Sequence, residues 1–404
     1  VHELEQDFFS PKQFEGRFNC LMFSTDASGL YAFPYGTFIG TVSTTFSYKE
    51  WAKGSPGDNA GNLWAVVHET GHHYQKLFNL ARCLESSNNL WSNIAVWKRG
   101  ASVSRLDAPQ KLFDRFNRDQ SWFDMDLGDR SRMYWQLWLY YVELGKKPTF
   151  FHELFEKFRK DPIDSRNAKT DYLRFARFCS EVAQEDLTEF FTFYGFFKKT
   201  GENLPLKYND GFYDRVYAPA TISVSQADID ECKTEMSKYS KKANNLLFID
   251  ERIRQTPATF EGHKPGDVRW ATIGGLNPGD SRVFGDVGHY TDFGTKDQPG
   301  TTAQPKAVQW EERTIRIEGT GAVGYKVYDA QGKLVMVANR HAFTIPAQLD
   351  LSQIKICVAG GDGGEVEIYK DGKILPAYDK SLSFDNPVGL TVSTGTKNPF
   401  GKYI

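Results

Sequence analysis

A cluster of titratable side chains at residues 68–73 is the feature of this chain with the clearest chemical meaning. The run HETGHH holds His68, Glu69 and His72 in a chain that has only 8 histidines among 404 residues. Residues four apart on an α-helix lie one turn apart on the same face, so the imidazoles of His68 and His72 can bind one ion. In the pattern H-E-x-x-H the two histidines bind zinc and the glutamate is a general base. The sequence therefore predicts a zinc site with Glu69 as the catalytic residue.

A catalytic zinc ion needs a third protein ligand and an open position for water. Glu85 is the candidate, because the residues between His72 and Glu85 leave room for the first helix to end near Leu80 and for a second helix to return. Asn89 lies four residues after Glu85, and we expect its amide to orient a ligand histidine. His73 lies about 100° round the helix from His72, so we expect it near the ion but not bound to it.

Gly71 points to the element that must carry the third ligand. A glycine inside a helix costs about 1 kcal/mol relative to alanine. Its presence between Glu69 and His72 predicts that another element packs closely against this turn, as a second helix bearing a ligand would.

The elements expected before the site are strands, and those after it are helices. Residues 18–48 are rich in β-branched and aromatic residues, with Asp26–Gly29 as a turn. We expect the strand FIGTVST, residues 38–44, to bind extended substrate through its edge. Apolar residues at three- and four-residue intervals predict helices over most of residues 84–200, and another from Gln226 to Lys242 capped by Ser225. Three tyrosines of this region are candidates to stabilise an oxyanion, with a place in the core as the alternative: Tyr134, Tyr140 and Tyr141.

The character of the chain changes after about residue 256. Glycine, proline, aspartate and threonine dominate first, and short alternating runs follow Arg313. DAQG and KDG between such runs are typical of hairpin turns. These patterns predict an all-β domain at the C-terminal end.

Composition excludes several classes of function. Hydrophobic residues make up 40% and charged residues 25%, with a formal net charge of −2, which is an ordinary globular balance. This charge argues against nucleic acid or an anionic membrane surface as the main partner. No apolar run reaches the length of a membrane span. The five cysteines are scattered without C-x-x-C spacing, which argues against a disulfide framework.

The run HETGHHYQ followed by LESSNN resembles the M60/enhancin-type zinc metallopeptidases. The segment GNLWAVV before the histidines resembles the tryptophan-containing lead-in of that family, and LYAFPYG resembles its aromatic-proline strand. The resemblance covers roughly residues 20–240. It implies a zincin fold of the gluzincin type, with zinc (Zn²⁺) as cofactor and His68, His72 and Glu85 as ligands. It also implies, as in many relatives, cleavage of O-glycosylated mucin-type proteins, and a secreted or cell-surface/periplasmic location.

The expected fold is therefore α+β, with a zincin-like catalytic domain that has a largely helical lobe, followed by a C-terminal all-β domain. We assign the zincin strands and active-site helices to residues 1–100, the helical lobe to 101–257 and the β-domain to 258–404. The expected function is zinc-dependent endopeptidase activity on a mucin-like glycoprotein, by attack of metal-activated water. We expect the protein to be a monomer.

Three other functions remain open. The chain could be a general zinc peptidase that does not depend on glycan, or a glycan- or protein-binding module with a vestigial zincin site. The complete set of Glu69 and three ligands argues against the binding module. An aminopeptidase-like gluzincin usually has a G-x-M-E-N run, which does not occur here.

Overall fold

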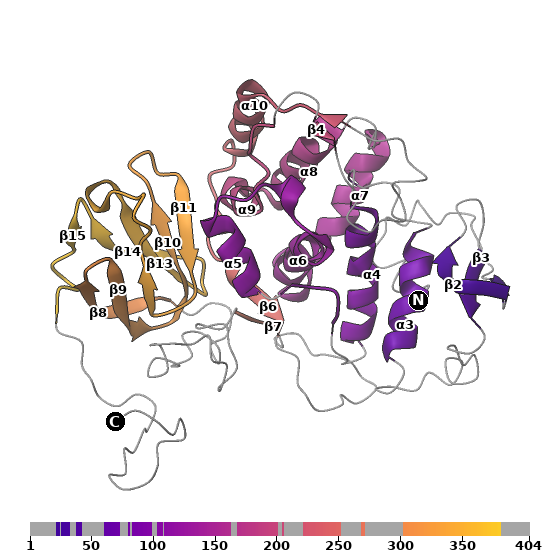
Figure 1. Cartoon of the computed structure of the whole chain (residues 1–404), viewed down its shortest axis with the longest axis horizontal. Helices are drawn as coiled ribbons and strands as arrows, with labels where there is room; N and C mark the ends of the chain where they lie inside the picture. Colours follow the sequence, from indigo (N-terminus) through magenta and orange to yellow (C-terminus); the bar gives the residue numbers. More distant parts are fainter. Residues whose placement is uncertain are drawn as a thin grey trace, which may run out of the picture.

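Three structural regions follow one another along the long axis of the molecule (Figure 1). A small sheet with helix α3 lies at one end, a helical body lies in the middle, and antiparallel sheets lie at the other end. The computed structural model describes residues 22–24, 26–32, 38–42, 60–72, 80, 83–98, 103–107, 109–162, 168–200, 204–205, 221–251, 268–270 and 302–380.

The N-terminal sheet has three short strands. They are β1 (Met22–Ser24), β2 (Asp26–Ala32) and β3 (Phe38–Val42), in the order β1-β3-β2. β1 runs parallel to β3, and β2 runs antiparallel to it. The predicted strands are confirmed, but the predicted turn is wrong. Asp26–Gly29 lies inside β2, where the register with β3 shifts between Asp26 and Tyr31.

The position of β3 corrects the expectation about substrate binding. Because β3 is the central strand, both of its edges already pair with neighbouring strands. Residues 38–42 therefore have no open edge for a peptide to join, and the edge strands in the described part of this sheet are β1 and β2.

The helical body begins with two helices that pack against each other. α3 (Ala60–Gly71) lies on the N-terminal sheet and against α4 (Leu84–Lys98). The remaining helices of the body are α5 (Pro109–Asn117), α6 (Leu127–Trp138), a π-helical turn η4 (Leu139–Glu143), α7 (Phe150–Lys160), α8 (Ala168–Ala183), α9 (Thr188–Phe193) and α10 (Gln226–Met236). Short 3₁₀ turns lie at Trp122–Asp124 and Leu246–Phe248. The helices expected over residues 84–200 are confirmed.

α10 shows how local sequence fixes a helix boundary. Ser225 and Asp228 form a reciprocal capping box, in which each side chain accepts a hydrogen bond from the other's backbone N–H, as the cap predicted. The helix ends at Met236, earlier than the expected Lys242.

Aromatic side chains fill the core of the helical body. Four tryptophans and four tyrosines of this region are less than 2% exposed: Trp97, Trp122, Trp135, Trp138, Tyr134, Tyr140, Tyr141 and Tyr194. Their large buried area accounts for the high aromatic content of the chain.

The C-terminal region consists of two antiparallel sheets. Its strands are β8 (Gln304–Glu311), β9 (Thr314–Thr320), β10 (Ala322–Tyr328), β11 (Leu334–Ala338), β12 (Ala342–Thr344), β13 (Lys355–Gly360), β14 (Glu365–Lys370) and β15 (Lys373–Ile374). The orders are β11-β10-β13-β14-β15 and β12-β9-β8. The predicted turns DAQG and KDG join β10 to β11 and β14 to β15, with Gly332 and Gly372 at φ 75° and 78°. Such angles favour glycine.

Short strand pairs complete the described structure. β4 (Leu204–Pro205) pairs with β5 (Thr221–Ile222), and β6 (Ile249–Glu251) pairs with β7 (Val268–Trp270). The expected α+β class, with a helical region followed by an all-β region, is confirmed. The domain boundaries at 100 and 257 stay predictions. No helix in the described ranges is long and apolar enough to cross a lipid bilayer.

Candidate metal centre

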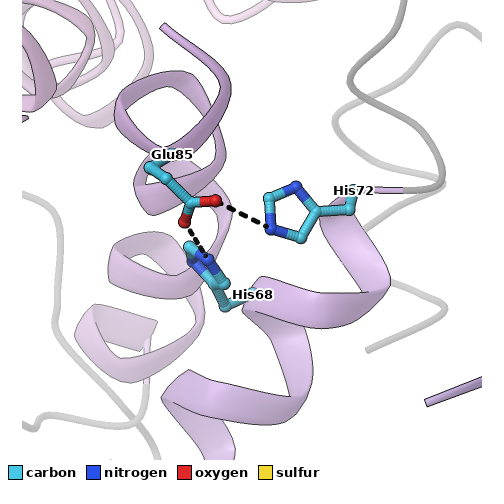
Figure 2. Close-up of side chains that lie close together, drawn as sticks. All are labelled: His68, His72 and Glu85. Carbon is cyan, nitrogen blue, oxygen red and sulfur yellow. Dashed lines mark hydrogen bonds and ion pairs between the residues drawn. The ribbon is translucent and has the colours of Figure 1, made fainter. Parts of the chain in front are cut away.

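The packing of α3 against α4 brings the three predicted ligands together. In Figure 2, Glu85 lies between the two histidines, and its carboxylate faces both rings. Glu85 Oε2 lies 2.8 Å from His68 Nε2, and Glu85 Oε1 lies 3.6 Å from His72 Nε2. One ligand atom from each residue lies within 4.8 Å of the others. His68 is buried, and His72 and Glu85 are partly buried. The site is thus a partly covered group of two imidazoles and one carboxylate.

Local sequence accounts for this arrangement. His68 lies on the last turn of α3, and the backbone N–H of His72 donates to the His68 carbonyl at 3.3 Å, so both rings share one face. Glu85 lies in the first turn of α4. The helix expected to reach Leu80 ends at Gly71, and residues 73–79, with His73, lie outside the described residues.

Gly71 confirms the close approach that its position predicted. A Cβ atom there would overlap the amide oxygen of Asn88 and would lie 2.5 Å from Trp91 Cδ1, both on α4. The amide of Asn88 also donates to the backbone carbonyl of His68. The two helices therefore touch through a glycine beside the ligand residues.

Asn89 does not take the role that its spacing predicted. It is fully buried, and its amide nitrogen donates to Ser131 Oγ on α6 at 2.9 Å. The neighbouring Asn88 is the residue that reaches α3. A rotation of about 100° per residue separates the two side chains, and the face of α4 that packs on α3 carries Asn88.

Trp64 belongs to the site, although the sequence reasoning did not single it out for a role there. Its ring stacks on the imidazole of His68, with centroids 4.8 Å apart and planes at 17°. His68 and His72 meet edge to face at 4.7 Å. The signal that could have found Trp64 is its place four residues before His68, on the same helical face.

The donor set fits a zinc ion. Ligand atoms at about 2.0–2.2 Å from a tetrahedral ion lie roughly 3–3.5 Å from one another. The two separations from Glu85, 2.8 and 3.6 Å, bracket that range. Glu69 follows the first histidine on α3 and is 7% exposed, which places a buried carboxyl beside the ligands in sequence.

The three candidate tyrosines lie in the core. Tyr140 donates its hydroxyl to Asn245 Oδ1 at 3.0 Å, and Tyr141 donates to Glu185 Oε2 at 2.8 Å. Burial, and then the Glu185 carboxylate, raise the pKa of Tyr141 well above its usual value. Burial likewise raises the pKa of Tyr134. The core alternative therefore describes these residues.

A second group of carboxylates lies on the helical body. Asp107, Asp126 and Asp129 each offer an oxygen within 4.8 Å of the others. The ammonium of Lys111 lies 2.6 Å from Asp107 Oδ2 and 2.7 Å from Asp126 Oδ2, and Arg115 contacts Asp129. Two cations of the chain thus lie against these three carboxylates. Burial raises the pKa of Asp129 to about 8, with further contributions from Asp107 and Asp126.

Two sequence families match the chain. Residues 31–195 match the family described as Peptidase M60, enhancin and enhancin-like, and residues 308–367 match the Peptidase M60 C-terminal domain. The two ranges together cover more than half of the chain. The chain belongs to the M60 peptidase family. The first range contains the three ligand candidates and Glu69, and membership in this family of metallopeptidases implies a metal cofactor.

Solved structures support the same fold for this M60 chain. A metallopeptidase from Bacteroides thetaiotaomicron has 24% sequence identity and a TM-score of 0.69, over 90% of this chain and 59% of its own. A metallopeptidase solved in complex with Tn antigen has 25% identity and a TM-score of 0.63, over 85% of this chain and 60% of its own. The chain thus spans about three fifths of the length of these relatives. No curated protein matches the sequence at a significant level.

Proposed function

We propose that this M60 chain is a zinc-dependent endopeptidase, with His68, His72 and Glu85 as the metal ligands and Glu69 as the general base. The observation that carries the proposal is the position of Glu85 on α4, with its carboxylate oxygens 2.8 Å from His68 Nε2 and 3.6 Å from His72 Nε2. Two imidazoles and one carboxylate, with a further position left for water, are the ligand set of catalytic zinc in peptidases.

The ligand residues and Glu69 have different roles in the proposed reaction. Zinc at these ligands would polarise the scissile carbonyl and make water acidic near neutral pH. Glu69 accepts a proton from the attacking water and passes it to the leaving amine. His68 and Glu69 lie in the last turn of α3 and His72 follows its last residue, so one helical turn brings two of the ligands and the base together. This arrangement fixes their mutual positions before substrate binds.

The proposed substrate is an O-glycosylated, mucin-type protein. The support is family membership and the M60-like structure that was solved with Tn antigen. A secreted or cell-surface location would bring the enzyme to such a substrate, and we include it in the proposal. The alternative within the same chemistry is a general zinc peptidase, for which the glycan makes no difference.

Metal analysis tests the ligand set. We expect one zinc per chain in the wild-type protein and a large loss of zinc affinity in His68→Ala and in Glu85→Ala. His73→Ala is the control, and we expect it to keep the metal because Glu85 faces His68 and His72. Wild-type zinc affinity in Glu85→Ala would remove Glu85 from the site, and loss of zinc in His73→Ala would overturn the choice between adjacent histidines.

A pair of peptides tests the substrate. One sequence is made with and without a single O-linked sugar beside the cleavage site. If the glycan is recognised at the transition state, its removal lowers kcat/KM. Equal rates on both peptides would reject glycan dependence and leave the general peptidase. Cleavage of neither, with zinc bound, would favour the binding-module alternative.

A further inference from the structure

The ring of Trp64 connects the candidate metal centre to an exposed arginine. His68 stacks on this ring at 4.8 Å, and the guanidinium carbon of Arg105 lies over the same ring at 4.1 Å. Trp64 and His68 belong to α3, whereas Arg105 belongs to the segment at residues 103–107 after α4. Three groups from two parts of the chain thus meet at one ligand of the site.

The imidazole of His68 needs such a contact to fix its orientation. A ligand histidine usually donates its second ring N–H to a carboxylate or a carbonyl, which sets the plane of the ring. Here Nε2 faces Glu85, and Nδ1 is buried with no hydrogen-bond partner in the described part of the chain. Stacking on Trp64 is therefore the contact that can hold the ring plane while Nε2 points at the ion.

Trp64 is itself held by a buried asparagine. Its indole Nε1 donates to Asn93 Oδ1 on α4 at 3.1 Å. Asn93 also accepts from the backbone N–H of Ser104 and donates to the Ser104 carbonyl, both at 3.0 Å. One fully buried side chain thus ties α3 to the segment that carries Arg105.

Arg105 occupies a backbone conformation that is unfavourable for its residue type. Its φ is 55°, in the left-handed region, and its side chain is exposed except for the contact with Trp64. Residues held in this region persist only when their surroundings impose it, and they gather at functional sites. The segment is held at its other end as well, because Arg132 Nε donates to the Asp107 carbonyl at 2.8 Å.

We infer that Trp64 and Arg105 are positioning residues for His68, with Arg105 acting through the Trp64 ring to keep the imidazole aligned for metal binding. The inference rests on the proposed function, since it assumes that His68 binds the ion. Neither residue touches the reacting atoms in this assignment. Their effect is on the geometry of one ligand and hence on metal affinity.

The direction in which zinc affinity changes when Arg105 is removed distinguishes this role from others. If Arg105 acted directly on the ion, its positive charge would repel zinc, and its removal would strengthen binding. If Arg105 acts through the ring, its removal loosens Trp64 and weakens binding. If Arg105 has no link to the site, its removal changes nothing.

Zinc affinity, measured by competition with a chelator on the full chain, is the main readout. We expect Trp64→Leu to bind zinc roughly 10- to 100-fold more weakly, as for the loss of other groups that orient a ligand. Trp64→Phe keeps a ring against His68 and should recover most of the affinity. The visible spectrum of the cobalt-substituted protein should change in Trp64→Leu and stay close to wild type in Trp64→Phe. Equal losses in the two variants, or wild-type affinity in Trp64→Leu, would overturn the inference.

Arg105→Ala tests the second residue without disturbing the core. We expect zinc to bind about two- to fivefold more weakly, which is the size of an exposed cation–π contact. The same substitution in a Trp64→Leu background should have no further effect, because Arg105 acts only through the ring. Arg118→Ala, which removes an exposed arginine at the end of α5, is the control. Tighter or unchanged zinc binding in Arg105→Ala, or an equal loss in both backgrounds, would overturn the role of Arg105.

The His68→Ala variant distinguishes failure of the positioning role from failure of the proposed function. If His68→Ala loses zinc while Trp64→Leu retains wild-type affinity, the positioning role fails and the proposed function stands. If His68→Ala binds zinc as the wild type does, the proposed function fails first. Melting curves of the chelator-treated variants exclude general unfolding as the cause of a lost affinity.

Discussion

Gly71 and Asn88 leave no room between them for a side chain. The glycine lies on α3 beside both ligand histidines, and the asparagine lies one turn after Glu85 on α4. This one contact sets how closely the two ligand-bearing helices approach. The separation of Glu85 from the histidines therefore depends on a residue that is itself no ligand.

We expect Gly71→Ala to weaken zinc binding and to lower stability. The added methyl group meets Asn88 and Trp91, so α4 must move away from α3 and take Glu85 with it. Overpacking of this kind typically costs about 1–3 kcal/mol. Urea unfolding of the chelator-treated protein measures the stability, and competition with a chelator measures the affinity. If Gly71→Ala is destabilised but binds zinc as the wild type does, Glu85 keeps its place beside the histidines, and this expectation is wrong.

We expect Glu69→Gln to keep its zinc and its fold but to lose nearly all proteolysis. The amide has the size of the carboxyl but cannot accept a proton, and general acid–base catalysis contributes about 10²–10⁴-fold to a rate. Zinc content and kcat on one peptide substrate, measured on the same preparation, check this. A variant with near wild-type turnover would exclude Glu69 as the base.

We expect Lys326→Ala to destabilise the protein by about 3–5 kcal/mol, because it removes the buried cation between two partly buried carboxylates and leaves them the Tyr328 hydroxyl as donor. Lys326 on β10 is fully buried, and its ammonium lies 2.8 Å from Glu189 on α9 and 2.7 Å from Glu365 on β14. Burial alone would lower the pKa of Lys326, but the two carboxylates outweigh it and raise that pKa.

Lys238→Ala is the control for this prediction. Lys238 forms an exposed ion pair with Glu235, and its loss should leave the midpoint of denaturant unfolding unchanged. Similar shifts of the midpoint in both variants would mean that the buried lysine does not stabilise the contact between the helical body and the sheets.

We expect Asp129 to make the protein less stable as the pH rises from about 4 to 8. Its pKa is raised from 3.8 to about 8 in the folded chain, chiefly by burial. Over that interval the folded state keeps a proton that the unfolded state has released, so the free energy of unfolding falls as pH rises. Asp129→Asn cannot titrate and should show a shallower fall between pH 5 and 8, measured by urea unfolding.

Asp350→Asn is the matched control for the pH series. The pKa of Asp350 is lowered by a hydrogen bond from the Ser352 backbone, so its titration lies below this interval. Its curve should run parallel to that of the wild type. A curve for Asp129→Asn that is also parallel would contradict the raised pKa.

Much of the candidate site could be predicted because its determinants are local. The spacing of His68 and His72 on one helix is set by helix geometry, and Glu85 needed only a short reversal of the chain. Gly71 predicted a close neighbour because a helix tolerates glycine poorly. The stack of Trp64 on His68 was equally local and could have been read from their four-residue spacing.

The parts that sequence did not predict depend on how elements are oriented in space. Whether Asn88 or Asn89 faces α3 depends on the rotation of α4 about its own axis, which is set by its neighbours and not by the residues of α4 alone. The β-branched and aromatic residues at 38–42 predicted a strand but not its central place in the sheet, because strand order is set by distant partners. The contact of Arg105 with Trp64 joins two segments that are separated by all of α4.

One contact between the helical body and the C-terminal sheets bears on how the protein can be divided. β11 is an outer strand of its sheet, and the side chain of Asn117 on α5 both donates to the carbonyl of Val337 and accepts from its N–H, at 2.9 and 3.0 Å. The Asn117 side chain thus pairs with both backbone groups of Val337, as a neighbouring strand would. Expression of the C-terminal sheets without α5 would uncover these two backbone groups of Val337 on an outer strand, and exposed outer strands recruit other chains. We therefore expect a fragment that begins before residue 109, and so keeps α5, to self-associate less than one that begins after it.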